Sequence, residues 1–263
     1  MMVLRGFLML ILAGFLVGVL VGLTGVGGGA LMTPLLLLIF GVAPVTAIGT
    51  DLWFAAITKM AAGKMHHTKG LIDWQVLRYL WSGSLPASII MILLMRNGFV
   101  ALDISFLKTA VAIAILITAL SMLFQKQLHG LGKHLRISDA ERFKKWQPTL
   151  TVIAGAVLGG LVTLTSIGAG AVGVVMLTYL NPLRLTPARL VATDIVHAIP
   201  LAMFAGLGHL FIGNIDFSLL GWLLIGSIPG VLIGATLSSK LPQNPLRIAI
   251  AIVLSLVALK LLL

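Results

Sequence analysis

Four long stretches without a charged residue constrain this chain most; they cover residues 6–50, 146–183, 195–215 and 217–239. Each reaches or exceeds the roughly 20 apolar residues that a membrane-spanning helix needs. Inside a bilayer every backbone amide must be paired within the protein, which leaves helices or a closed barrel. The runs lack the two-residue alternation of a barrel strand. The sequence therefore predicts an all-α integral membrane protein.

The net charge of +11 does not indicate a nucleic-acid partner, because the basic residues lie between apolar segments instead of on a solvated face. They are better explained as signals of membrane orientation. The chain has no cysteine, which excludes disulfides and thiolate metal sites. We expect no cofactor and no metal site; His66 and His67 sit in a basic stretch without carboxylate partners nearby in the sequence.

The sequence matches itself at two nearly equal shifts. A shift of 141 aligns Gly14, Gly18 and Thr24 with Gly155, Gly159 and Thr165. A shift of 143 aligns Thr50, Asp51 and Asp73 with Thr193, Asp194 and Asp216. Matched polar residues do not arise from apolar composition alone. We therefore predict two membrane repeats, 1–124 and 149–263, joined by a basic linker, 125–148.

Each repeat divides into five expected helical segments. They are 7–24, 29–40, 45–62, 74–95 and 105–124 in the first, and 149–165, 169–180, 187–206, 217–237 and 246–263 in the second. An odd number per repeat places the second copy upside down in the membrane. Six lysines and arginines in the linker predict that it is cytoplasmic, with both termini outside and with Lys59, Lys64, Lys69 and Arg78 in one cytoplasmic region.

Segments 29–40 and 169–180 are too short to cross a hydrocarbon core of about 30 Å. A glycine-rich break precedes each of them, at 24–29 and 165–170. We expect glycine-rich broken or re-entrant helices whose tips meet near the midplane, one from each side, alongside six full crossings. Irregular backbone at that depth indicates a transport site.

Bare amides at the start of a short helix, with the positive end of its dipole, favour a small anion. The predicted substrate-binding residues are Thr24, Gly25, Gly27, Gly28 and Gly29 in the first half and Thr165, Ser166, Gly168 and Gly170 in the second. The alternative is that these glycines only permit close helix packing, and this is the favoured explanation for Gly14, Gly18 and Gly22.

The matched acids Asp51 and Asp194 are candidates for ion coupling, because an ionisable group within a membrane segment is costly. Since each follows a threonine near the start of its segment, helix capping is an equal alternative. His197, one turn after Asp194, can relay a proton or be structural. Asp73 and Asp216 are expected to be helix N-caps. Arg184 and Arg189 either attract anions or signal orientation.

The pattern from Gly18 through Thr24, Gly25, Gly27, Gly28 and Gly29 to Pro34, with its degenerate second-half copy, resembles the TauE/SafE family of sulfite exporters. The resemblance covers nearly the whole chain. It implies a prokaryotic-type, multi-pass transporter of the inner (cytoplasmic) membrane for sulfite, organosulfonates or related anions. The second copy departs from the pattern at Ser166 and Ala169 and has no proline matching Pro34.

The leading hypothesis is a secondary transporter that exports a small sulfur-containing anion by alternating access. Without a nucleotide-binding motif, its energy would come from protons, another coupling ion or the substrate gradient. A passive anion channel is the alternative. An enzyme is not expected, because the sequence offers no recognisable catalytic cluster. Its partners would be the anion and the lipid bilayer, and a homo-oligomer is left open.

Overall fold

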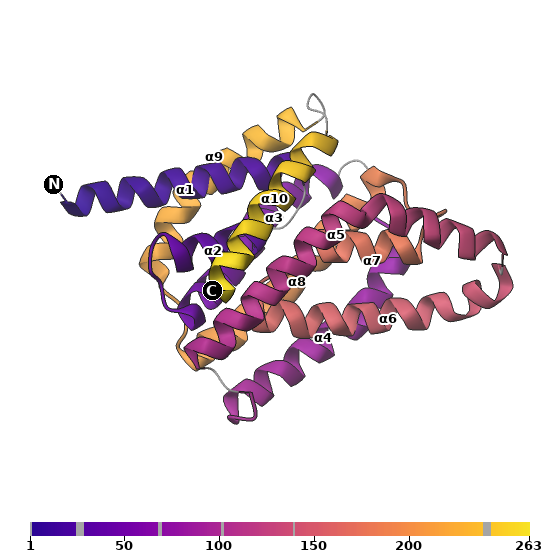
Figure 1. Ribbon diagram of the computed structural model, residues 1–263, viewed down its shortest axis with the longest axis horizontal. Helices are drawn as coiled ribbons and strands as arrows, with labels where there is room; N and C mark the ends of the chain where they lie inside the picture. The colour runs from indigo at the N-terminus through magenta and orange to yellow at the C-terminus, as the bar shows by residue number, and fades with distance from the viewer. Residues whose placement is uncertain (1, 25–28, 68–69, 101–102, 139, 239–242) are drawn as a thin grey trace.

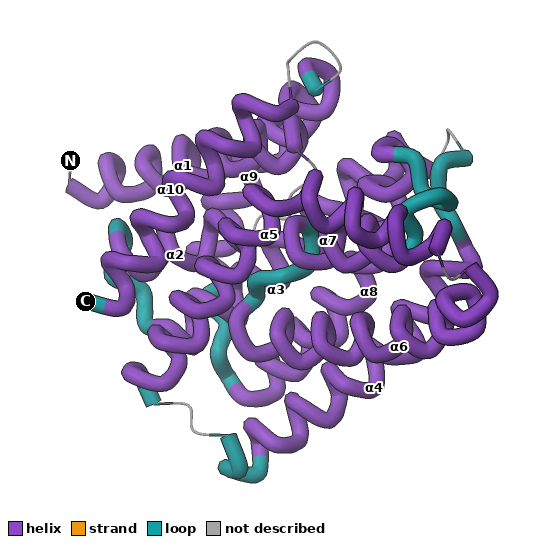
Figure 2. Tube along the Cα trace, turned by 45° about the vertical axis from the view of Figure 1, so that its right-hand side comes forward, coloured by secondary structure: helices purple, strands orange, loops and turns teal. Residues whose placement is uncertain are grey.

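The computed structural model describes residues 2–24, 29–67, 70–100, 103–138, 140–238 and 243–263. Every regular element in these ranges is a helix (Figure 2). The helices are α1 (Met2–Thr24), α2 (Gly29–Leu38), α3 (Pro44–His67), α4 (Trp74–Arg96), α5 (Ile104–Ser138), α6 (Ala140–Thr165), α7 (Ala171–Leu180), α8 (Pro187–Ile212), α9 (Phe217–Leu237) and α10 (Gln243–Leu262). The predicted all-α fold is confirmed.

Local sequence signals explain several helix starts. The carboxylates of Asp73 and Asp216 accept hydrogen bonds from the backbone N–H groups of Val76, at 3.2 Å, and Leu219, at 2.9 Å. Both acids are therefore the N-caps that were predicted, for α4 and α9. Helix α8 begins with Pro187, whose missing N–H costs nothing at a first helical position.

Seven described helices are long and apolar enough to cross a membrane: α1, α4, α5, α6, α8, α9 and α10. The chain is thus a multi-pass membrane protein. The expected total of six full crossings is wrong, because α1 and α6 each have the length of a complete span and are not short arms of hairpins. Helices α2 and α7, of 10 residues each, are too short to span, as predicted.

The helices pack mainly across the two halves of the sequence (Figure 1). Helix α1 lies along α9 and α4 lies along α6, while α3 packs on α8 and α5 on α10. Exchanging each helix of the first half for its counterpart in the second leaves these pairs unchanged. The halves are therefore interlocked, and neither encloses a core of its own.

Close backbone approach explains the glycines spaced four residues apart on α1. A Cβ atom at Gly18 would lie 2.5 Å from the carbonyl oxygen of Ser227, and one at Gly14 or Gly22 would also collide with the backbone of α9. Helix packing is thus the role of these three glycines, as the sequence favoured.

The basic linker is helical where the structure describes it. Helix α5 continues to Ser138 and α6 begins at Ala140, so both helices extend beyond the apolar segments expected from hydropathy. Figure 1 shows these extensions projecting together from one end of the helical body.

Candidate transport site

The matched acids lie inside the protein. Asp51 and Asp194 are both fully buried, on α3 and α8. Each stands seven residues after the first residue of its helix, Pro44 or Pro187, and α8 is capped instead by Thr186. The alternative that these acids cap their own helices is therefore wrong.

Each acid faces the first turns of the short helix in its own half. The Asp51 carboxylate accepts a hydrogen bond of 2.5 Å from the hydroxyl of Thr33 on α2. The Asp194 carboxylate faces the backbone N–H of Gly170, the N-cap of α7. A Cβ atom at Gly173 would collide with Asp194 Oδ1, so this helix turn leaves room only for glycine. The positive end of α7 thus points to one carboxylate, and α2 contacts the other through Thr33 in its second turn.

The second glycine-rich break is buried and irregular. The Thr165 hydroxyl donates to the Leu161 carbonyl at 2.7 Å and accepts from the Ile167 N–H at 3.1 Å, so it holds the break together. Gly168 and Gly170 have φ values of 119° and 132°, which side chains rarely allow. Ser166 also has a positive φ, 61°, and its buried hydroxyl makes no hydrogen bond. Such strain in a buried segment is typical of functional sites.

The two short helices converge on one centre. The Ser166 side chain of the second break lies near enough to the Asp51 carboxylate of the first half to interact with it. Ala30 at the start of α2, and Ile167 and Ala171 at the start of α7, belong to one buried apolar cluster. The sequence-predicted residues Ser166, Gly170, Asp51 and Asp194 are therefore brought to the same place.

Lys59 is the residue of this centre that the sequence reasoning missed. It was assigned to a cytoplasmic basic region, but its side chain is only 2% exposed. Its Nζ atom donates a hydrogen bond of 3.0 Å to the carbonyl of Ala169, in the second break. The signal was available, because Lys59 falls within the predicted segment 45–62, and an ionisable group inside a span is a functional candidate.

Several polar atoms of the centre have no hydrogen-bond partner in the part of the chain that the structure describes. They are Oδ1 of Asp51, both carboxylate oxygens of Asp194 and the hydroxyl of Ser166. Buried polar groups are nearly always paired, so unpaired atoms at one place need an explanation. A bound proton, ion or substrate would supply partners for them.

His197 is fully buried on α8, but it does not contact Asp194 through a hydrogen bond. Its Nε2 atom lies 2.9 Å from the Ser84 hydroxyl on α4, and its Nδ1 atom has no partner. The counterpart of His197 in the first half, Phe54, is also fully buried. A coupling role for His197 stays a prediction.

The first glycine-rich break is only partly described. Gly25, Gly27 and Gly28 lie outside the described residues, while Gly29 is the first residue of α2. The hydroxyl of Thr24, at the end of α1, donates to the Leu20 carbonyl at 2.7 Å. The side chains of Lys64, His66 and His67 also lie outside the described part of the chain.

A cavity of about 450 Å³ approaches the centre from the side of the linker. Its inner wall includes Val174, beside Gly173, and Leu190, one helical turn before Asp194. Its outer part is lined by polar and basic side chains, among them His129 and Arg247. The cavity therefore lies against the segments of α7 and α8 that also carry Gly173 and Asp194.

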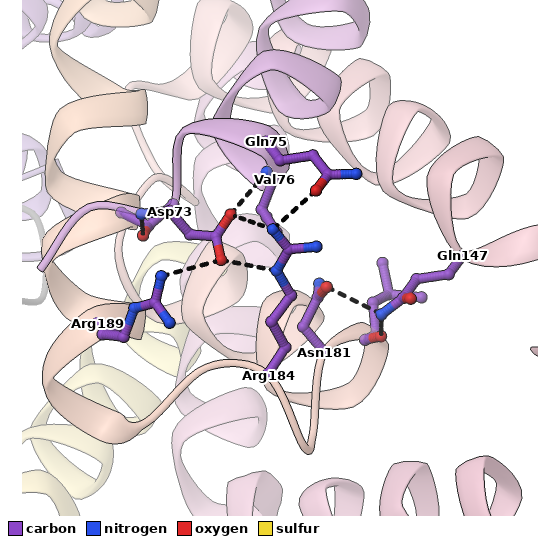
Figure 3. Close-up of polar contacts among 9 residues, drawn as sticks. Asp73, Gln75, Val76, Gln147, Asn181, Arg184 and Arg189 are labelled. Carbon is purple, nitrogen blue, oxygen red and sulfur yellow. Dashed lines mark hydrogen bonds and ion pairs between the residues drawn. The ribbon is translucent and has the colours of Figure 1, made fainter. Parts of the chain in front are cut away.

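An ion-pair network joins the two halves (Figure 3). Its Arg184 also lines a second cavity, of about 370 Å³. Arg184 contacts both oxygens of Asp73, at 2.7 and 2.8 Å, and Arg189 contacts one at 3.2 Å. Asp73 is 3% exposed, so the pairs are shielded on one side. The two arginines, expected to attract anions or signal orientation, are thus held by an acid that also caps α4.

Burial acts to raise the pKa of Asp73, since it favours the protonated form. Hydrogen bonds from Arg184 and the Val76 N–H, with the charges of both arginines, outweigh that effect. The pKa of Asp73 is therefore held below its ordinary value of 3.8. Asp73 is therefore ionised at neutral pH.

A multi-pass helical bundle with unpaired ionisable groups buried at its centre and a cavity beside the helices that carry them has the features of a membrane transporter. Residues 10–261 match the family described as Sulfite exporter TauE/SafE, and the chain belongs to that family. Its relatives include the probable membrane transporter protein YjnA of Bacillus subtilis (strain 168), 36% identical, which covers 96% of this chain and 98% of the relative.

Two more distant relatives carry the same description. The probable membrane transporter protein YdhB of Bacillus subtilis (strain 168) is 26% identical, over 92% of this chain and 95% of its own length. The probable membrane transporter protein MJ0441 of Methanocaldococcus jannaschii is 29% identical, over 79% of this chain and 73% of its own. No solved structure matches the chain.

Proposed function

We propose that this protein is a secondary transporter that exports a small sulfur-containing anion, such as sulfite or an organosulfonate, across the cytoplasmic membrane. The carrying observation is the meeting of two short-helix starts, from different halves, at the buried centre of Asp51, Asp194 and Lys59. Helix N-termini provide N–H donors and positive potential for an anion. Membership of the TauE/SafE family favours sulfur oxyanions.

In this proposal the two halves are inverted repeats that rock against each other around the fixed centre. The helix pairs support a repeat of this kind, because the pair α1–α9 becomes the pair α6–α4 when each helix is replaced by its counterpart in the other half. The basic linker lies in the cytoplasm and both termini lie outside. The cavity beside Arg247 is then the cytoplasmic entrance, and the Asp73–Arg184 network closes or opens with it.

The energy comes from an ion gradient. Asp51 and Asp194 carry protons, since unpaired carboxylate oxygens in the protein interior can bind and release them. Neither the energy source nor the substrate requires a nucleotide or a cofactor.

Purified protein in vesicles tests the proposal. Labelled sulfite, taurine and methanesulfonate are offered from outside, with sulfate and chloride for comparison, in the presence and absence of a proton gradient. We expect saturable entry of at least one sulfur anion, stimulated by the same unlabelled anion on the opposite side. Absence of flux for the whole panel would refute a transporter of small anions.

Counterflow also separates a transporter from the alternative, a passive anion channel. A carrier exchanges labelled for unlabelled substrate faster than it moves substrate alone, whereas a channel shows non-saturating conductance. Electrical recording of the same preparation would detect the channel directly.

A further inference from the structure

Lys59 is a buried ammonium group whose hydrogen bond of 3.0 Å goes to an uncharged carbonyl, that of Ala169. A charge taken out of water is strongly unfavourable unless opposite charges lie near it. The burial of Lys59, at 2% exposure, therefore requires nearby anions.

Three titratable side chains surround Lys59 closely enough to interact with its charge. Asp51 lies two turns earlier on α3, and Asp194 and His197 come from α8. The two carboxylates interact with the ammonium across the centre, without a direct ion pair. His197 is turned away to Ser84. The acids are thus the countercharge of Lys59, but neither is bonded to it.

This separation matters because, among the described residues, Lys59 has a hydrogen-bond acceptor for only one of its donors. An ammonium has three donors, and one of them is used by the Ala169 carbonyl. The break that carries Ala169 also carries the unpaired Ser166 hydroxyl and leads to the N-terminus of α7. An anion at this position would receive a cation, a hydroxyl donor and a helix N-terminus together.

We propose that Lys59 is the cation of the transport centre: in the empty protein it balances one of the two carboxylates of Asp51 and Asp194 while a proton neutralises the other, and it binds the substrate anion directly during transport. The inference rests on the proposed function and adds a ligand to it. It also predicts that sodium is not the coupling ion.

Sodium is disfavoured by the same geometry. Carboxylate, hydroxyl and carbonyl oxygens such as those of Asp194, Ser166 and Ala169 are the ligands that a hard cation prefers. Here a tethered ammonium already donates to the Ala169 carbonyl and supplies a positive charge beside the acids. An added sodium ion would meet a centre that holds its cation already.

The matched variants are Lys59→Gln and Lys108→Gln, both measured by sulfite flux into vesicles. Lys108 is exposed near the start of α5, outside the centre, and serves as the control. We expect the sulfite concentration at half-maximal flux to rise at least tenfold for Lys59→Gln and to stay within twofold for Lys108→Gln. Wild-type flux should be equal in sodium and choline media.

A second variant guards against misfolding, because removing Lys59 leaves two carboxylates without a cation. Lys59→Gln/Asp194→Asn removes one negative charge together with the positive one, and we expect it to purify as a folded protein with the same weak sulfite response. Wild-type half-saturation in either folded variant, or sodium-dependent flux in the wild type, would overturn the role of Lys59 and leave the proposed function standing. Wild-type vesicles without any anion flux would overturn both.

Discussion

The hydroxyl oxygen of Thr193 lies 3.0 Å from the backbone nitrogen of Asp73 and accepts its hydrogen, which ties α8 of the second half to the start of α4 in the first. Thr50 does the same for the backbone nitrogen of Asp216, at 3.1 Å, so α3 is tied to the start of α9. Each matched Thr-Asp pair therefore has two partners. The threonine holds a helix of the other half, and the acid faces the short helix of its own.

Thr193→Val removes the acceptor of a buried backbone N–H and keeps the side-chain shape. An unsatisfied buried donor costs about 1–3 kcal/mol, and we expect that loss of unfolding free energy. Thermal unfolding in detergent measures it. The control is Thr236→Val, whose exposed hydroxyl bonds only within its own helix and whose loss should change stability by less than about 0.5 kcal/mol. Equal unfolding temperatures for both variants would contradict the tie.

Hydropathy and helix-terminating residues predicted the helices well. An apolar run must be helical inside a bilayer, and proline, aspartate and glycine mark where helices begin and end. Each of the ten expected segments begins or ends within two residues of an observed helix, and the largest departures are the inner ends of α5 and α6. Those ends are polar helix in the linker, where hydropathy carries no signal. The span count failed for a related reason, since a break in a sequence does not show which arm is short.

The composition of the centre was predictable only in part. Asp51 and Asp194 were found because duplication marks them as polar residues that both halves share. Lys59 has no matching polar residue in the second half, since the shift of 143 aligns it with Ala202. Its contact with Ala169, 110 residues away, depends on how the halves interlock, and periodicity carries no information on that.

Gly18→Ala tests whether the four-residue glycine spacing is a packing device. The added Cβ atom would lie 2.5 Å from the Ser227 carbonyl oxygen and 2.8 Å from its Cα, so backbone must move. We expect a loss of about 1–3 kcal/mol, as for other overpacked interiors. Gly221→Ala on α9 is the matched control, because nothing lies within 4 Å of its Cβ position and alanine is the better helix former. Unfolding in detergent should therefore separate the two in opposite directions.

Asp73→Asn removes the charge that holds Arg184 and Arg189 but keeps a side chain able to cap α4. We expect a loss of about 1.5–3 kcal/mol near neutral pH, the range for hydrogen bonds to charged groups. Because the folded-state pKa is lowered below 3.8, the contribution of the wild-type acid is complete above that pH and disappears as pH falls through the lowered value. Melting of both proteins from pH 7 downward measures the difference. A gap that widens in acid would contradict the ion pairs.

Asp194→Asn and Asp51→Asn test whether the buried acids carry protons. If they do, each variant should lose most of the pH dependence of sulfite flux, since asparagine has the same shape and no titration. Sulfite itself titrates in the working range, so each profile is divided by that of Asp103→Asn, whose exposed carboxylate only caps the start of α5 and lies outside the centre. The ratio isolates the protein's own protons. A ratio that stays constant from acid to alkaline pH would assign both carboxylates to the electrostatic balance of Lys59 alone, because removing them would then leave coupling intact. A ratio that changes with pH for one acid only would assign the proton to that acid, and its partner to the balance of charge.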